Sequence, residues 1–289
     1  MELLRYVSVM VAIGGTLRFG MADSLTLEPV ADNTLIEDPL GSVSNGAGTA
    51  MQAGLNGANL IRRAVLRFDV EGAIPTGARI TQAALTLENT SGTVGSATCG
   101  LYRVTASWGE GASYGAGGQG QGAASQSGDA TWIHRIWPDV MWATPGGEYA
   151  TIQSASMVVN ANGSYTWSSV QLARDVQSFL DAPARNYGWL IKGDEVLTRS
   201  VKRFSTREES NSGIRPRLKI DFDRCPSDLN GDVAVDDSDF ALFVTAYNLL
   251  DCADPAMAPG CPADLNTDGA VNDLDFVVIV AAYSELICG

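Results

Sequence analysis

An acidic segment of twelve residues occurs twice near the C-terminus, and its two copies begin 36 residues apart, at Asp228 and Asp264. Each copy places carboxylate or amide side chains at positions 1, 3, 5, 9 and 12 and leaves a backbone carbonyl at position 7. Hard divalent cations such as Ca²⁺ are held by oxygen ligands in this arrangement. The repeat therefore predicts a pair of calcium loops, because an acidic surface turn would not reproduce the same spacing twice.

The excess negative charge of the chain is concentrated around these two loops. Residues 225–289 contain 12 acidic and no basic side chains, whereas residues 1–224 contain 21 acidic and 19 basic ones. A region with this charge repels itself unless cations neutralise it, and it offers no basic surface to nucleic acid or to an anionic membrane. We therefore expect metal ions as its counterions and no nucleic acid as a partner.

The N-terminus has the layout of a secretory signal. Arg5 precedes an apolar run over residues 6–17, and small residues precede Asp23. This run is too short for a normal membrane span. We predict a signal peptide over residues 1–22, a secreted or cell-surface protein, and no membrane span once the signal is removed. In the alternative interpretation, residues 9–13 form an early core strand.

Four of the five cysteines repeat together with the calcium loops. Cys225 and Cys261 each lie three residues before a loop, and Cys252 and Cys288 each follow them by 27 residues. This spacing indicates a duplicated unit closed by disulfides. Symmetry allows Cys225 with Cys288 and Cys252 with Cys261, or Cys225 with Cys252 and Cys261 with Cys288. We favour the first pairing, because it joins the two ends of the module and closes a short loop.

Residues 24–222 alternate apolar and polar side chains over short runs that are separated by Gly, Asn, Asp and Pro; examples are residues 62–68, 82–88 and 189–192. Short strands with frequent turn signals predict an all-β sandwich of the jelly-roll type. Apolar residues at helical spacing predict one helix over residues 168–181, and the Gly-rich residues between Trp108 and Gly128 predict a long mobile loop. Cys99 belongs to this region, either as a buried free thiol or as half of an intermolecular bridge.

Each calcium loop continues into an apolar segment that starts with phenylalanine and ends with tyrosine, Phe240 to Tyr247 and Phe276 to Tyr283. The twinned loops with these segments resemble type I dockerins, in particular those with flanking cysteines in secreted planctomycete-like proteins. The resemblance implies a small all-α module of two loop-helix motifs, two Ca²⁺ ions and a cohesin-like protein partner. We therefore divide the chain into a signal peptide (1–22), a sandwich (23–223) and a dockerin-like module (224–289).

Transferred position by position, the resemblance implies six ligands in each loop, of which position 7 offers its carbonyl and position 9 acts through water. They are Asp228, Asn230, Asp232, Ala234, Asp236 and Asp239 in loop one, and Asp264, Asn266, Asp268, Ala270, Asn272 and Asp275 in loop two. Loop one has Val233 where the family has glycine, and a β-branched residue is disfavoured at the positive φ of that turn. We therefore expect loop one to bind calcium more weakly than loop two.

Dockerins select their partner through positions 10 and 11 of the loops. These positions hold Asp237 and Ser238 in loop one, and Asp273 and Leu274 in loop two. Because the two pairs differ, the resemblance does not support a dual binding mode in which either helix docks in the same way.

The first domain is similar to DNRLRE-domain proteins over several segments, among them residues 32–36, 63–69, 74–80 and 204–209. Those proteins are β-sandwiches, and a related group is classed as carbohydrate-binding, so the resemblance implies a polysaccharide or other surface ligand. Tryptophans in loops can stack on sugar rings, and an arginine fork matches a uronate carboxylate. The candidate ligand-binding residues are Trp132, Trp137, Trp142 and Arg207. In the alternative, the tryptophans fill one end of the sandwich and the arginine lies on a solvated strand face.

No catalytic motif stands out in the sequence. His134 is the only histidine, which leaves no zinc site of the usual type, and the motifs of serine hydrolases, phosphate loops and zinc proteases are absent. We predict a non-catalytic protein whose sandwich binds a polysaccharide or surface ligand and whose calcium module docks a protein partner. One alternative is a structural or adhesive subunit that self-associates with calcium in an extracellular fibre or surface layer. Another is an enzyme that acts on polysaccharide.

Overall fold

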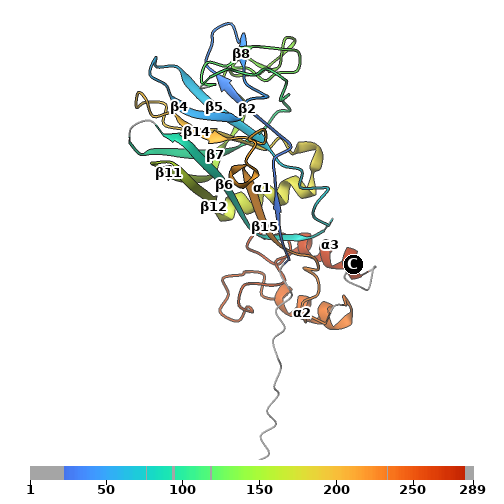
Figure 1. Ribbon diagram of the computed structural model, residues 1–289. Helices are drawn as coiled ribbons and strands as arrows, with labels where there is room; N and C mark the ends of the chain where they lie inside the picture. The colour runs from blue at the N-terminus through green and yellow to red at the C-terminus, as the bar shows by residue number, and fades with distance from the viewer. Residues whose placement is uncertain (1–22, 76, 93–94, 118, 233, 284–289) are drawn as a thin grey trace, which may run out of the picture. The chain divides into compact units, whose positions relative to one another are not determined.

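The computed structural model describes residues 23–75, 77–92, 95–117, 119–232 and 234–283. These residues divide into two compact units, with the boundary between Cys225 and Pro226. The first unit is an antiparallel β-sandwich, and the described part of the second contains the helices α2 (Asp237–Tyr247) and α3 (Asp273–Tyr283) (Figure 1). The predicted fold class is confirmed, whereas the predicted signal peptide lies outside the described residues.

The first sheet is built around the long strand β6 (Arg79–Gly92). β12 pairs with one edge of β6, while β15 and then β14 pair with the other edge, and β1 adds to the far side of β15. Burial alternates along β15, where Leu218, Ile220 and Phe222 face the interior, as the period-two pattern predicts. The strands of this sheet besides β6 are β1 (Asp23–Leu27), β12 (Gly163–Ser168), β14 (Lys202–Ser205) and β15 (Arg217–Asp223).

The second sheet has the order β11, β7, β13, β5, β2. It is connected to the first through β4 (Ala50–Leu55), which pairs with β14 up to Ala53 and with β5 from Gly54 onward. Gly54 has φ +121°, and a Cβ there would lie 2.8 Å from Val201 Cα, so only glycine allows this passage between sheets. The strands are β2 (Ala31–Ile36), β5 (Ile61–Arg67), β7 (Ala97–Val104), β11 (Tyr149–Val159) and β13 (Trp189–Lys192).

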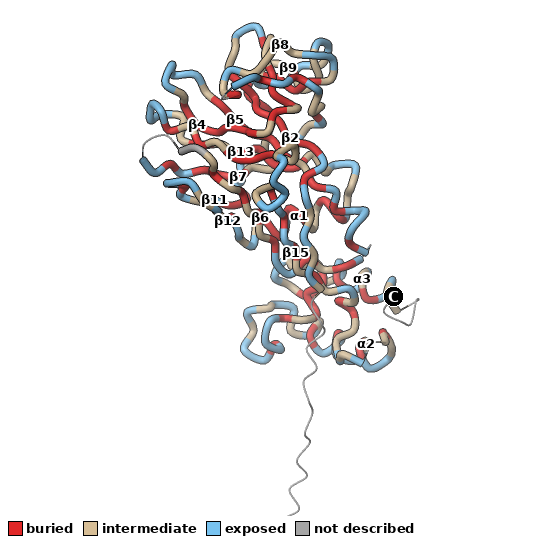
Figure 2. Tube along the Cα trace, viewed as in Figure 1, coloured by how far each residue is buried: buried red, intermediate tan, exposed pale blue. Residues whose placement is uncertain are grey.

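Two tryptophans occupy the centre of the core between the sheets, which Figure 2 shows as the buried interior of the sandwich. Trp189 makes edge contacts with Phe68 and Phe179, with ring centroids 6.3 and 5.0 Å apart, and its indole N–H donates to Asp175 Oδ2. The indole N–H of Trp167 donates to the carbonyl of Cys99 over 2.8 Å. Because both polar N–H groups have an acceptor, these large side chains are buried without an unsatisfied donor.

Helix α1 (Val170–Asp181) lies beside β6 (Figure 1), at the position that the sequence predicts. Ser169 is its N-cap residue, and its hydroxyl accepts a hydrogen bond from the N–H of Leu172. The helix buries Ala173, Val176 and Phe179 against the core, and a 3₁₀ turn (Pro183–Arg185) follows it. A second 3₁₀ turn covers Ser212–Ile214.

The Gly-rich segment between Trp108 and Gly128 is a loop, as the sequence predicts, and hydrogen bonds attach parts of it to the sandwich. The buried carboxylate of Asp129 accepts hydrogen bonds from the N–H groups of Ser113 and Gln126. Trp108 and Trp142 pack over the outer face of the second sheet, in a small apolar cluster that is separate from the main core. This long connection also contains the short strands β8 (Ala123–Ala124), β9 (His134–Ile136) and β10 (Val140–Met141), and β8 pairs with β3 (Val43–Ser44).

Cys99 is a free and fully buried thiol, and burial raises its pKa to about 12. Because the thiolate is the reactive form, we expect iodoacetamide at pH 8 to label native Cys99 about 1,000-fold more slowly than an exposed cysteine. Mass spectrometry of the native chain and of the chain in denaturant checks this. Labelling of the native protein at the rate of the unfolded one would contradict it.

Candidate metal centre

Loop one is closed by the aspartate at its last position. The side chain of Asp239 is fully buried, and its Oδ1 accepts hydrogen bonds from the N–H groups of Leu229 (2.7 Å) and Asn230 (3.0 Å). Its Oδ2 accepts from the N–H of Asp236 over 3.0 Å, while Asp236 in turn caps α2, so the two residues form a capping box. One carboxylate thus joins the start of the loop to the first turn of the helix.

Asp228 and Asp232 of loop one accept local hydrogen bonds from the loop backbone. Asp228 accepts from the N–H of Gly231, and Asp232 accepts from that of Ala234, which is typical of Asx turns. One oxygen each from Asp228, Asp232 and Asp239 lies within 4.8 Å of the others. Two oxygens that bind one Ca²⁺ at about 2.4 Å are at most about 4.8 Å apart, so these carboxylates fit a shared calcium ion.

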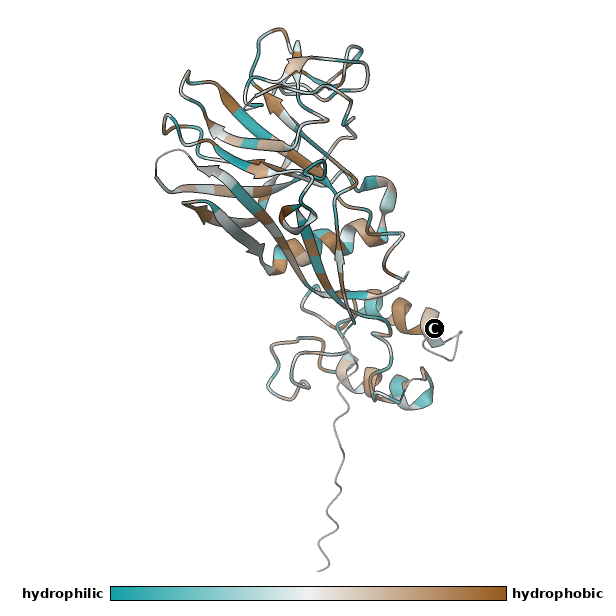
Figure 3. Ribbon diagram, in the orientation of Figure 1, coloured by the Kyte–Doolittle hydropathy of each residue, from teal (hydrophilic) through white to brown (hydrophobic). Residues whose placement is uncertain are grey.

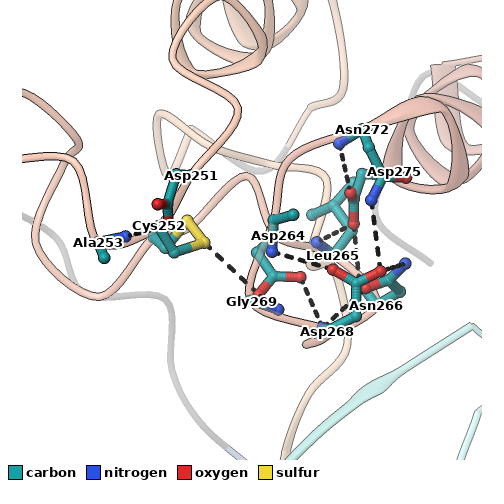
Figure 4. The surroundings of a disulfide bond; sticks show 12 residues. Asp251, Cys252, Ala253, Asp264, Leu265, Asn266, Asp268, Gly269, Asn272 and Asp275 are labelled. Atoms are coloured by element: carbon teal, nitrogen blue, oxygen red, sulfur yellow. Dashed lines mark hydrogen bonds between the residues drawn. A yellow bond between two sulfur atoms is a disulfide. The ribbon is translucent and has the colours of Figure 1, made fainter.

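Loop two repeats this hydrogen-bond pattern, as Figure 4 shows. Asp275 is fully buried, its Oδ1 accepts from Leu265 (2.7 Å) and Asn266 (3.0 Å), and its Oδ2 accepts from Asn272 over 2.9 Å. The sequence repeat is therefore a structural repeat, with equivalent donors at positions 2, 3 and 9 of each loop.

The first ligand of loop two lies beside the disulfide. In loop two, Asp264 Oδ2 accepts a hydrogen bond from the N–H of Gly269 at position 6, and Cys252 Sγ lies 3.6 Å from the same oxygen. The sulfur carries no proton in a disulfide, so this contact is not a hydrogen bond. Burial raises the pKa of Asp264, and the charges of Asp275 and Asp268 add to this effect, whereas the N–H bonds of Gly269 and Asp268 oppose it. A cation beside these carboxylates relieves the same repulsion.

Position 4 shows a difference between the loops that the sequence argument missed. Gly231 has φ 77° in loop one, but the equivalent residue in loop two is Thr267, with φ 60°. A β-branched residue in the left-handed region is strained. The expected weakness at Val233 lies outside the described residues, so the prediction about loop one stands untested, and loop two contains a strained residue of its own.

Cys252 and Cys261 form a disulfide whose Cα atoms are 5.4 Å apart. This is the short-loop bond of the pairing that we favour, and it rules out a bond between Cys252 and Cys225. The second predicted bond joins Cys225 to Cys288, which lies outside the described residues.

Two of the four predicted partner-selecting residues, the position-10 aspartates, are hydrogen-bonded across the two repeats. Tyr247 at the end of α2 donates its hydroxyl to Asp273 at the start of α3 over 2.5 Å, and Tyr283 at the end of α3 donates to Asp237 at the start of α2 over 2.6 Å. These reciprocal bonds raise the pKa of both tyrosines. All four position-10 and position-11 residues, Asp237, Ser238, Asp273 and Leu274, are exposed.

The tryptophans expected to bind a ligand do not form one exposed platform. Trp142 is buried and donates its indole N–H to the carbonyl of Thr131, so it is not free to stack on a sugar. Trp132 is half-buried with the guanidinium of Arg63 5.1 Å from its ring, and Trp137 is half-buried with its ring edge against the buried His134. The burial of Trp142 agrees with the alternative that the tryptophans are buried, although it packs on the outer face of the second sheet and not at one end of the sandwich.

Arg207 is also engaged within the sandwich instead of lying free for a ligand. Its Nε and Nη2 donate to the two carboxylate oxygens of Glu110 over 2.7 and 2.6 Å, and Glu208 lies 2.9 Å from its Nε. A bidentate pair of this kind occupies the fork that we expected to bind a uronate.

The family model of the type I dockerin domain matches residues 226–282. Dockerin domains of this type bind calcium and dock onto cohesins, and proteins that contain them are typically extracellular components of cellulosomes. No curated protein matches the chain. Among the described residues, no helix combines the length and the apolar character that crossing a bilayer requires.

The two position-4 residues offer a matched pair of substitutions. We expect Thr267→Gly to stabilise the calcium-loaded C-terminal module by up to about 1 kcal/mol, because it relieves the left-handed threonine. The reverse change in loop one, Gly231→Thr, should destabilise the module by about 1–2 kcal/mol. Denaturant unfolding in saturating calcium measures both, and effects of the same sign would contradict the assignment of strain.

Removal of calcium should loosen the C-terminal module. An ion that binds only the folded loops adds about 2.7 kcal/mol per site when free calcium is 100-fold above its Kd. We expect EDTA to expose the buried Phe243 to chymotrypsin, and added calcium to protect it. Mass spectrometry of the cleavage products reads this out. Equal cleavage in EDTA and in calcium would refute the calcium assignment.

Proposed function

We propose that this protein is secreted and non-catalytic, that its sandwich binds a polysaccharide, and that its C-terminal module holds two calcium ions and docks a cohesin-bearing partner. The observation that carries the docking half is the pair of loops with equivalent buried aspartates, Asp239 and Asp275, inside a region that matches the type I dockerin domain. The calcium ions would hold each loop against its helix and neutralise its carboxylates. Their role would be structural and not catalytic.

The face of α3 is the better candidate for the partner contact. Leu274 is 63 % exposed, and Val277 and Val280 continue an exposed apolar row at helical spacing, which lies on the hydrophobic stretch of α3 in Figure 3. The equivalent of Leu274 in the first repeat is the polar Ser238. Leu242 of α2 lines a groove together with Met257 and Pro262 of the disulfide-closed segment. We propose that the partner contacts α3 and that α2 does not substitute for it.

Exchange of the two position-11 residues tests this choice. We expect Leu274→Ser to weaken calcium-dependent binding to an immobilised type I cohesin by at least about tenfold. The reason is that a leucine side chain that becomes buried in the interface contributes more than about 1.4 kcal/mol to the free energy of binding. Ser238→Leu is the matched control and should leave the affinity within about twofold. Surface plasmon resonance with the full chain measures both, and the opposite ranking would assign the contact to α2.

The sandwich has an aromatic and cationic surface on the outer face of its second sheet. The rings of Tyr102 and Tyr149 lie 5.4 Å apart, and Lys192 Nζ lies 6.0 Å from the centroid of Tyr149. Gln153 adds an exposed amide that donates to the Tyr102 hydroxyl. Tyrosine rings stack on sugars. The partly exposed Lys192 lies 3.5 Å from Glu195 Oε2 and still presents its charge at the surface, which supports an acidic polysaccharide as the ligand.

A glycan array with and without calcium tests the sandwich half of the proposal. We expect retention of uronate-containing glycans, a loss of at least about fivefold in Tyr149→Ala and Lys192→Gln, and no change in Lys219→Gln. Lys219 is a suitable control, because it is an exposed lysine of the other sheet. Depolymerisation of the glycan would contradict the non-catalytic proposal, and calcium-dependent polymerisation without glycan binding would favour a structural subunit.

A further inference from the structure

Three carboxylates from distant parts of the chain meet in the sandwich. Asp32 belongs to β2, Glu110 to the loop after β7, and Glu208 to the segment after β14. One oxygen of each lies within 4.8 Å of the others. This is the same separation that brings together the three carboxylates of loop one. Asp32 and Glu208 lie in segments that carry the DNRLRE-like resemblance, whereas Glu110 does not.

Most oxygens of the cluster have donors. Asp32 Oδ2 accepts from the N–H of Arg207 over 2.9 Å, and Glu110 Oε1 accepts from the N–H of Asp32 over 2.8 Å. The guanidinium of Arg207 contacts both oxygens of Glu110 and Oε1 of Glu208. These bonds fix the orientation of the three carboxylates from one side.

Two buried oxygens of the cluster have no donor, Asp32 Oδ1 and Glu208 Oε2. Asp32 is 0 % exposed, so water does not reach its side chain from the surface. A buried carboxylate oxygen without a partner is costly, because the group has lost its hydration and gained nothing in return. The hydrogen bonds of the cluster are therefore incomplete while all three carboxylates are ionised.

The charge of the cluster points to a cation as the missing partner. Three carboxylates face a single guanidinium, and burial together with the charge of Glu208 raises the pKa of Asp32 well above its ordinary value. Burial also raises the pKa of Glu208. A bound divalent cation would remove this penalty.

We propose that Asp32, Glu110 and Glu208 form a third divalent-cation site, inside the sandwich and separate from the two loops of the C-terminal module. All its side-chain ligands are carboxylates, which favours calcium over zinc or copper, and the spacing of the oxygens fits bonds of about 2.4 Å. The ion ties β2 to two loops, including the long connection that covers the outer face of the second sheet. Its role is structural, and it is independent of cohesin docking.

The number of ions per chain tests this proposal in the full-length protein. After chelator treatment and dialysis against calcium, we expect Glu208→Gln to hold one ion fewer than the wild type, as measured by elemental analysis. Glu209→Gln is the matched control, because Glu209 is the adjacent carboxylate and bonds to Ser210 and Asn211 instead of the cluster. It should keep the wild-type number of ions. Equal numbers in the wild type and in Glu208→Gln would overturn the proposal.

A second measurement does not depend on the folding of a cluster variant. All six tryptophans lie between residues 108 and 189, so tryptophan fluorescence reports the melting of the sandwich alone. Calcium at 100-fold above Kd should raise this melting temperature by about 5 °C or more. The double variant Asp228→Asn and Asp264→Asn, which removes a ligand from each C-terminal loop, should keep the shift.

The results of these two experiments distinguish a failure of the proposed sandwich site from a failure of the proposed calcium binding by the C-terminal module. If the C-terminal loops held no calcium, the wild type would still exceed Glu208→Gln by one ion. If the tryptophan-monitored shift disappeared in the double variant, or if magnesium produced it and calcium did not, the calcium site in the sandwich would be refuted.

Discussion

Buried carboxylates that accept backbone N–H bonds hold the irregular parts of both modules together. Asp239 and Asp275 each collect three N–H donors and thereby close a loop that contains no regular structure. Asp129 does the same for the Gly-rich connection of the sandwich. A carboxylate is suited to this role, because its two oxygens offer about four acceptor directions and its charge strengthens each bond. The cost is repulsion wherever several such groups meet, which is why cations matter to this chain.

The duplication of the calcium loops produces two repeats that share their bonding pattern and differ in their surfaces. The tyrosine at the end of each helix bonds to the aspartate at the start of the other, so the two repeats stabilise each other symmetrically. The next position is serine in one repeat and leucine in the other. Symmetry therefore serves the fold of the module, and the difference between Ser238 and Leu274 leaves one preferred face for a partner.

The residues predicted to bind a carbohydrate are mostly engaged in contacts within the sandwich. Tryptophan and arginine are versatile residues, and their use depends on what the folded chain places around them. Trp142 became part of an apolar cluster, and Arg207 became the partner of Glu110. The surface that the structure offers instead contains Tyr102, Tyr149 and Lys192.

The sequence by itself determined the features that depend on neighbours along the chain: the two calcium loops, helix α1, the strands around residues 62–68 and 189–192, and the short disulfide loop. The bonds of the calcium loops, of helix α1 and of the short disulfide join residues at most about a dozen positions apart, so spacing reveals them. The strands pair with distant parts of the chain, but their period-two pattern is local and reveals them as strands. Only the tertiary structure determined that Arg207 pairs with Glu110 and that the carboxylates of Asp32, Glu110 and Glu208 lie close together. Those contacts join residues 78 to 175 positions apart, and such pairs are set by how the sheets pack, which leaves no periodic trace in the sequence.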